Sequence, residues 1–481
     1  MLQKRQNDRF QRRLIMERLE DRTVLSGNVT ASLDPVNGLL SVIGDSGDNA
    51  IAITQEADGT AIIAGADTTT VNGEAFAAFG NATGISIQFL DGNDSVDLES
   101  VVLPGAVTIT AGIGNDAVTL QNSTFQQADI AIGTEAAGAI GNNTVTIGND
   151  VVTGDHLNLV LLNQSGLNGS TNGGGAGLSP GSANVVTMND VQFTGAGDLN
   201  VTVEDGFTTS NGTQLIGSSS VLMTSIQTAG DVAVNLGNSF QTVQLGTGVE
   251  NSTDVAANNL AVSVGNDVNA LLVTATVAQN ETVTTGDATF LMSLASPPTI
   301  AVNGSVGNDL AVTIGNNTND SLPEGWPVQV SDSVQGNASI RTGDGIALDV
   351  AQSSVGGLLD ISLGGGGVNA VESLTLQDVT SADLSIGLRS NAGDIADVNL
   401  TNVTVTDTAP ATFTFRLSDV GGSGGFDQVS LMNVQVAEGL QVILSSGEGN
   451  ILSATNVTVL FSSLDLGPDG IFQDGGGNSG L

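Results

Sequence analysis

The chain contains no cysteine and no tyrosine, and it has one histidine and one tryptophan among 481 residues. Without cysteine no disulfide can form, so the folded state must depend on packing and hydrogen bonds. Basic side chains are nearly missing beyond position 22. The 50 acidic residues less the four in positions 1–22 leave 46 against three arginines, a formal charge of −43 for the body. Such a surface repels nucleic acid and anionic membranes, so we expect neither as a partner.

What the chain has is a repeat. The phrases VAVNLGN, LAVSVGN and LAVTIGN begin at Val232, Leu260 and Leu310. Three further strand-like stretches, similar to one another, begin 28 residues apart at Leu384, Thr412 and Leu440. The spacings of the first set are 28 and 50, and the second spacing fits two repeats. Apolar residues alternate with Thr, Ser, Asn and Gln, as in strands with one buried face. Units of this length bury their apolar faces by stacking, which predicts an all-β, right-handed parallel β-helix with rungs of about 22–30 residues.

Four segments follow from this pattern. Residues 1–27 are basic and predicted to form a short helical segment, and residues 28–88 are expected to form an N-terminal cap with hairpins. Residues 89–465 are expected to form the β-helix, and the Gly-rich residues 466–481 a disordered tail. No hydrophobic stretch is long enough to span a membrane. Asn and Gly at strand ends are expected at the corners, where positive φ is needed and stacked Asn side chains could form amide ladders.

The N-terminal segment carries a motif, Leu19-Glu-Asp-Arg-Thr-Val-Leu-Ser-Gly27, after an arginine-rich run. It resembles the LEPR-XLL-type signature of large bacterial exoproteins, in the planctomycete variant, with Asp21 where the name of the family has Pro. The resemblance covers about 20 of the 481 residues. It implies an extracellular or cell-surface protein, with a sorting motif formed by Leu19, Glu20, Asp21, Arg22, Leu25 and Ser26. The alternative is a basic helix on a cytoplasmic protein.

A second local resemblance concerns calcium. Residues 111–118, AGIGNDAV, resemble the calcium-binding nonapeptide of RTX repeats, with Ala111 in place of the first Gly, and residues 90–96 are a weaker relative. The resemblance implies that Asp94 and Asp116 supply carboxylate oxygens to Ca²⁺. The two residues are 22 positions apart, which is one rung and not one nonapeptide, so a cation could lie between them only if the rungs stack these turns. The alternative is that both residues close β-corners, and no cofactor is required for that role.

Two classes of function remain open. The first is a non-enzymatic exported structural or surface protein, an envelope scaffold or adhesin-like β-helix whose acidic rod presents loops, with a calcium-dependent adhesin as a variant. The second is a carbohydrate-active β-helix of the polysaccharide lyase or glycoside hydrolase type, which would need clustered carboxylates or a basic residue in a groove with aromatic side chains. Cell-envelope components or polysaccharide are the expected partners in either case. No catalytic residue is indicated, because His156 has no accompanying triad pattern. The oligomeric state and the export route are left open.

Overall fold

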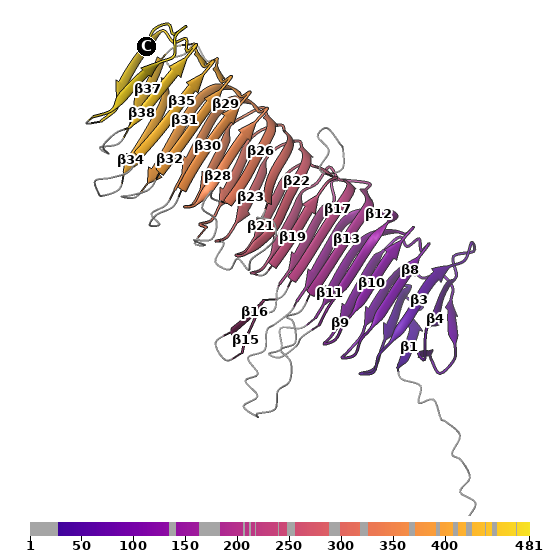
Figure 1. Cartoon of the computed structure of the whole chain (residues 1–481). Helices are drawn as coiled ribbons and strands as arrows, with labels where there is room; N and C mark the ends of the chain where they lie inside the picture. Colours follow the sequence, from indigo (N-terminus) through magenta and orange to yellow (C-terminus); the bar gives the residue numbers. More distant parts are fainter. Residues whose placement is uncertain are drawn as a thin grey trace, which may run out of the picture.

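The fold is a rod of stacked parallel strands, seen in a computed structural model of the chain (Figure 1). The structure describes residues 27–133, 141–162, 183–204, 207–210, 213–216, 218–238, 240–247, 255–287, 299–317, 326–364, 371–390, 395–406, 412–419, 426–437, 439–444, 450–467 and 469–481. The basic segment predicted to be helical, with its sorting motif, lies outside these residues. Within them the secondary structure is all β, and the predicted parallel β-helix is confirmed.

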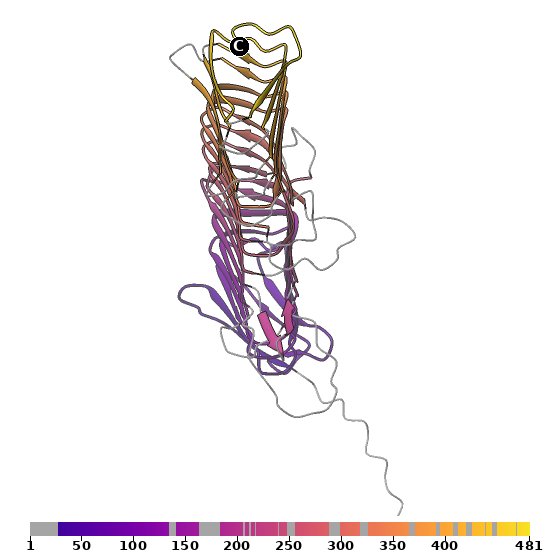
Figure 2. The same ribbon diagram turned by 60° about the vertical axis from the view of Figure 1, so that its left-hand side comes forward.

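Each rung of the helix runs along three faces, which we number in chain order. Figure 2 shows the stacked rungs from another side. Strands of successive rungs pair in parallel, so that equivalent side chains form columns. Corner residues one rung apart are mostly separated by 21 to 31 positions, close to the predicted rung length. A separation of 42 between Asn158 and Asn200 reflects the long connection 162–182.

The strands are grouped here by face. Face 1 is formed by all or part of β3 (Ala50–Gln55), β8 (Ser95–Glu99), β10 (Ala117–Gln121), β12 (Thr144–Leu161), β13 (Ala183–Phe193), β17 (Ser218–Gln227), β19 (Phe240–Leu245), β22 (Val268–Val277), β24 (Thr299–Val306), β26 (Trp326–Val334), β28 (Ile346–Ala351), β30 (Val371–Gln377), β32 (Ile395–Thr401), β35 (Phe426–Met432), β38 (Ile451–Thr455) and β40 (Ile471–Asp474). Face 3 is formed by all or part of β2 (Leu39–Ile43), β7 (Gly84–Gln88), β9 (Ala106–Ala111), β11 (Thr124–Ile132), β12, β14 (Asp198–Val203), β18 (Val232–Leu236), β21 (Leu260–Val264), β23 (Glu281–Thr285), β25 (Leu310–Ile314), β27 (Ala338–Thr342), β29 (Ser354–Leu363), β31 (Thr380–Ser390), β34 (Thr412–Asp419), β37 (Gly439–Ile443) and β39 (Phe461–Asp465).

Face 2 is short. It consists of β20 (Val255–Ala257), β33 (Thr404–Val405) and β36 (Gln435–Val436), together with the ends of longer strands that bend around a corner, such as the last residues of β22, β24 and β26. Outside the helix, β15 (Phe207–Ser210) and β16 (Thr213–Ile216) form an antiparallel hairpin.

The corner between faces 1 and 2 depends on residues that tolerate a left-handed backbone. One residue in most rungs has φ between 49° and 57° there: Ser100, Asn122, Asp190, Ser225, Gln352, Asp378, Asn402, Asn433 and Asn456. Several also form an amide ladder, since the Nδ2 atoms of Asn402, Asn433 and Asn456 each donate to the side-chain oxygen one rung before, at 2.7, 2.9 and 3.1 Å. The expected role of Asn at the corners is therefore confirmed.

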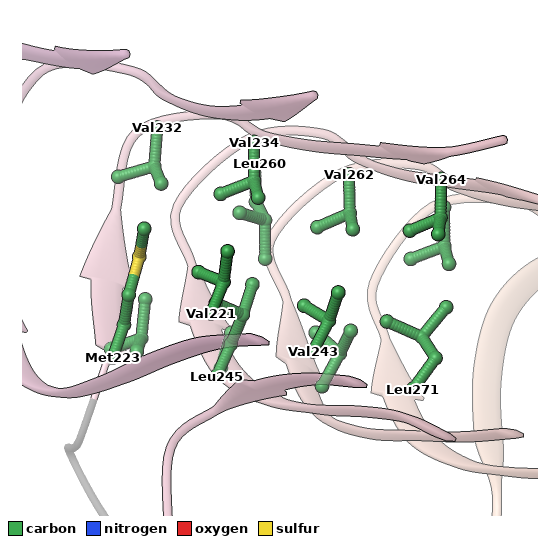
Figure 3. Packing of buried hydrophobic residues seen from close by; sticks show 14 of the residues in the cluster. Val221, Met223, Val232, Val234, Val243, Leu245, Leu260, Val262, Val264 and Leu271 are labelled. Atoms are coloured by element: carbon green, nitrogen blue, oxygen red, sulfur yellow. The ribbon is translucent and has the colours of Figure 1, made fainter. Parts of the chain in front are cut away.

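The interior is filled by columns of Val, Leu and Ile. In Figure 3, Val221, Met223, Val243 and Leu245 of face 1 lie opposite Val232, Val234 and Leu260 of face 3. Each of these side chains is at most 1% exposed. Because one face of every strand enters this core, a register shift by one residue would place apolar side chains in water and polar ones inside.

The two ends of the rod differ. At the first end β1 (Asn28–Leu33) pairs antiparallel with β2, and β4 (Ala61–Gly65) pairs antiparallel with β3 and with β6 (Phe76–Phe79), while the two-residue β5 (Thr70–Val71) pairs with β1. At the other end the structure contradicts the disordered tail expected over 466–481. β40 pairs with β38, and Ser479 bridges to Thr458, so this segment completes a rung. Its glycines lie at turns of that rung and do not mark a linker.

Candidate functional site: a loop-bearing corner and a carboxylate ladder

The corner between faces 3 and 1 carries most of the long connections. Residues 133–143 join β11 to β12, residues 162–182 join β12 to β13, residues 286–298 join β23 to β24 and residues 315–325 join β25 to β26. The connections at the other two corners mostly have four residues or fewer. Insertions gathered on one side of a solenoid are typical of its binding surface. This corner is therefore the candidate binding surface of the rod.

Asp94 and Asp116, the residues singled out for calcium, lie at this corner and are stacked by the rungs. They belong to a column of buried side chains that we call the inner ladder: Asn49, Asp94, Asp116, Asn143 and Asn184. From Asp94 onward, each Oδ1 accepts a hydrogen bond from the backbone N–H of the preceding member, at 2.8 Å for Asn49 N to Asp94 and 3.0 Å for Asp94 N to Asp116. The bonds continue from Asp116 N to Asn143 at 3.1 Å and from Asn143 N to Asn184 at 3.3 Å.

An outer ladder runs beside it, formed by Asp48, Asn93, Asn115 and Asn142. The backbone N–H groups of Asn93, Asn115 and Asn142 donate to the side-chain oxygen one rung before, at 2.8, 3.0 and 2.9 Å. Both ladders need only an acceptor oxygen at each position, which Asn supplies without charge. The corner-closing role therefore accounts for one oxygen of Asp94 and one of Asp116, but not for their being acids.

The second carboxyl oxygen of each acid is unusual. Oδ2 of Asp94 and Oδ2 of Asp116 are buried and have no hydrogen-bond partner within the described residues. Burial raises the pKa of Asp94 to about 6 and that of Asp116 to about 7, with the charge of Asp94 adding to the shift at Asp116. Ionisation of the two carboxyls is therefore opposed by the low polarity around them.

The arrangement fits calcium only in part. Two orphaned carboxylate oxygens one rung apart are suitable ligands, but Ca²⁺ takes six to eight oxygens. The backbone carbonyls of Asn49, Asp94 and Asp116 already accept N–H groups of the next rung. Successive turns also touch directly, because a Cβ on Gly112 would collide with the carbonyl oxygen of Leu90. No group of three or more His, Cys, Asp or Glu side chains suited to a metal occurs in the part of the chain that the structure describes. Calcium binding by Asp94 and Asp116 stays a prediction that rests on their Oδ2 atoms.

Two shallow grooves lie on face 1 beside the same corner. One, of ≈ 320 Å³, is lined by residues that include Pro327, Gln329, Asp349 and Thr375. The other, of ≈ 370 Å³, is lined mainly by small polar side chains such as Ser218, Ser220 and Thr242. Together they contain one carboxylate, Asp349, whose pKa is raised by burial, and no aromatic side chain. Neither groove offers the carboxylate cluster that a glycoside hydrolase would need.

The single tryptophan and the single histidine of the sequence both lie on strands of the rod. Trp326 is fully buried at the start of β26, so it does not line a groove. His156 on β12 contacts carboxylates on both sides, with Nε2 at 3.2 Å from Asp129 Oδ1 and Nδ1 at 3.5 Å from Asp155 Oδ2. No described helix is long and apolar enough to cross a membrane.

The sequence pattern does not single out two further acids, Glu281 and Asp332, which are buried inside the rod. A signal for Glu281 was present. The interval of 50 between Val-rich phrases at Leu260 and Leu310 requires one more rung, and the register places Glu281 there in the column of those leucines. The repeat pattern does not indicate that rung, because its phrase begins with Glu where the others begin with Val or Leu.

Comparison with protein-family models, with curated proteins and with solved structures finds no match for this chain. The LEPR-XLL resemblance of residues 19–27 therefore stays a prediction.

Proposed function

We propose that the protein is an exported, non-enzymatic scaffold of the cell surface, in which a rigid acidic rod presents the connections of one corner to envelope components or polysaccharide. The observation that carries this proposal is the gathering of the long connections at the corner between faces 3 and 1. Parallel pairing from β7 to β40 fixes the position of each connection along the axis. A rod of this kind places many contacts in a row, which strengthens weak individual contacts through multivalency.

The charge of the surface supports the same role. Acidic residues and amides line the corners, whereas the one ion pair of an arginine among the described residues, Arg341 with Asp360, is at the surface. A high charge of one sign keeps a long β-structure soluble and discourages edge-to-edge association. The N-terminal motif supports export, through its resemblance alone.

The proposal is tested by fractionation of cells that produce the full chain, a variant lacking residues 1–27, and a variant in which residues 163–182 are replaced by a short Gly-Ser linker. We expect the full chain at the cell surface, the first variant in the cytoplasm, and the linker variant exported but bound more weakly. Quantitative release of the full chain into the medium, with cleavage of a polysaccharide panel, would favour the carbohydrate-active alternative. Cytoplasmic retention of the full chain would refute the export part.

A further inference from the structure

Glu281 interrupts an apolar column of the interior. On face 3 the register places it between Leu260 of β21 and Leu310 of β25, both at most 2% exposed. Glu281 itself is 0% exposed, and neither of its carboxyl oxygens has a hydrogen-bond partner within the described residues. Its backbone is in regular pairing, since its N–H donates to the carbonyl of Asp309 at 3.0 Å. The carboxyl group is thus carried into the core by an ordinary strand.

Asp332 on β26 interrupts a second interior column, at the start of face 2. Val255, Ala275, Gly304, Asp332, Ser353 and Val379 succeed one another along this column. Asp332 is 2% exposed, and both of its carboxyl oxygens also have no partner among the described residues. Its backbone N–H donates to Ser353 Oγ at 3.3 Å. Valine occupies the column on either side of this group, so the small and polar residues form a local notch.

The notch spans the rungs that carry the two acids. Glu281 belongs to the rung of Ala275, and Asp332 lies two rungs further, with Gly304 between them. A Cβ on Gly304 would collide with the carbonyl oxygen of Ala275. The two rungs can therefore pack this closely only because residue 304 is glycine. Burial raises the pKa of Glu281 well above its usual range, with the charge of Asp332 adding to it, and burial raises the pKa of Asp332 to about 7.

No counter-charge reaches the pair from the strands packed against it. β21, β22, β24 and β25 carry no titratable side chain. Asp349 of β28 lines the outer groove, and Arg341 of β27 and Asp360 of β29 face each other at the surface, 3.4 Å apart. At the neighbouring corners Asp287 and Asp309 accept hydrogen bonds from Asn316 and Asn337. A dianionic pair in such a core would carry a desolvation cost that no charged side chain of these described strands offsets.

We propose that Glu281 and Asp332 form the pH-sensitive joint of the rod: both enter the core as neutral acids, and the rungs between β22 and β26 open before the others when the pair loses its protons. The protons come from solvent on folding and return to it on opening, so no other reactant is needed. The stability that the pair contributes is full below the ordinary pKa of a carboxyl group, because the opened state is then protonated as well. It declines as pH rises from there to the range where the folded pair ionises, because the opened state loses its protons first, and local opening is increasingly favoured.

The experiment compares hydrogen-exchange protection factors, which are corrected for the intrinsic rate at each pH, in the wild-type chain between about pH 5 and pH 9. In the wild type, protection of β22 to β26 should fall at least tenfold more than protection of β31 and β32. The double variant Glu281→Leu, Asp332→Val restores the residue types of the two columns and should remove the difference. The milder variant Glu281→Gln should reduce it while keeping the shape of the side chain.

Several outcomes would overturn the proposal. Equal loss of protection along the rod would show that no local joint exists. A wild-type segment that stays protected at high pH only when millimolar calcium is present, and loses protection with a chelator, would show that a cation and not a proton neutralises the pair. A double variant that keeps the steep pH dependence would assign it to other groups. The control variant Asp360→Asn, at the surface of the same region, should leave the pH dependence unchanged.

Discussion

The replacement of Asp116 by Asn separates the two roles considered for the inner ladder. Asn143 and Asn184 occupy the next positions of the ladder, and their Oδ1 atoms accept the same kind of backbone N–H bond. The variant Asp116→Asn therefore retains the bond from Asp94 N–H and removes only the acid. We expect it to gain stability at about pH 8 relative to the wild type, and to lose that advantage at about pH 4.

The size of the effect follows from linkage. The pKa of Asp116 is about 7 in the folded chain and 3.8 in the reference state. The folded form therefore binds the extra proton between these values, and the stability contributed by Asp116 is full below about pH 4, declines as pH rises to about 7, and is flat above it. A shift of about three pKa units corresponds to roughly 4 kcal/mol between the two plateaus. An unpartnered Nδ2 in the variant costs about 1–3 kcal/mol at every pH, so the pH slope is the diagnostic quantity.

The assay is the free energy of local opening of β8 and β10 from hydrogen exchange at several pH values, because a stacked array need not unfold in one step. Asp97→Asn, an exposed change on β8, is the matched control. The reasoning would be refuted by a variant with the slope of the wild type. A loss of stability at about pH 8 that appears only with millimolar calcium would instead establish Asp116 as a ligand.

Three further predictions concern the packing of the rod. Gly112→Ala should destabilise the adjoining rungs by about 1–3 kcal/mol in local hydrogen exchange, because its Cβ collides with a neighbouring carbonyl, whereas Gly80→Ala, which has open space, should have little effect; equal effects would contradict the direct stacking of turns. Asn433→Ala should lower the free energy of unfolding by about 1–3 kcal/mol, because it removes two ladder bonds and leaves alanine at φ 54°. Asn433→Gly should lower it less, because glycine adopts this φ without strain. Chemical denaturation with a local fluorophore would measure both variants, and an equal loss of stability would assign the whole effect to the hydrogen bonds. Arg341→Ala should change the melting temperature by less than about 2 °C, since its pair with Asp360 is at the surface; a larger drop would show that the arginine packs as well as pairs.

The sequence was sufficient for the architecture because the signal of a solenoid is repeated many times. Alternation along each strand gives the buried face, and the intervals of 28 and 50 give the rung length. The exact alignment was harder to predict. The 28-residue repeat aligns Leu384 with Thr412 and Leu440, but the structure pairs Ile386 with Phe415 and Phe415 with Val442, offsets of 29 and 27. Small changes in corner length cancel over two rungs, so a mean period conceals them.

The site was predictable only in its position. Gly and Asn residues predict the turns before Ser95 and Ala117. The rung spacing stacks Asp94 on Asp116, as the calcium hypothesis required. Whether an Oδ2 atom has a partner depends on which groups of other rungs surround it, and no local motif carries that information. For the same reason the sequence does not predict the buried site of Asp332, whose surroundings come from residues 275, 304 and 353.

Because connections of different length gather at one corner, the stacked strands set a fixed spacing between their attachment points. Neighbouring attachment points are spaced by the strand separation of about 4.8 Å, whatever the length of the segment attached to each. A connection can therefore lengthen, shorten or be exchanged without altering the distance between the ones on either side. Foreign peptides placed between Leu363 and Val371, or between Ile443 and Ile451, would be displayed at defined intervals along one edge. The fold thus separates the spacing of a display from its content, so the two can change independently.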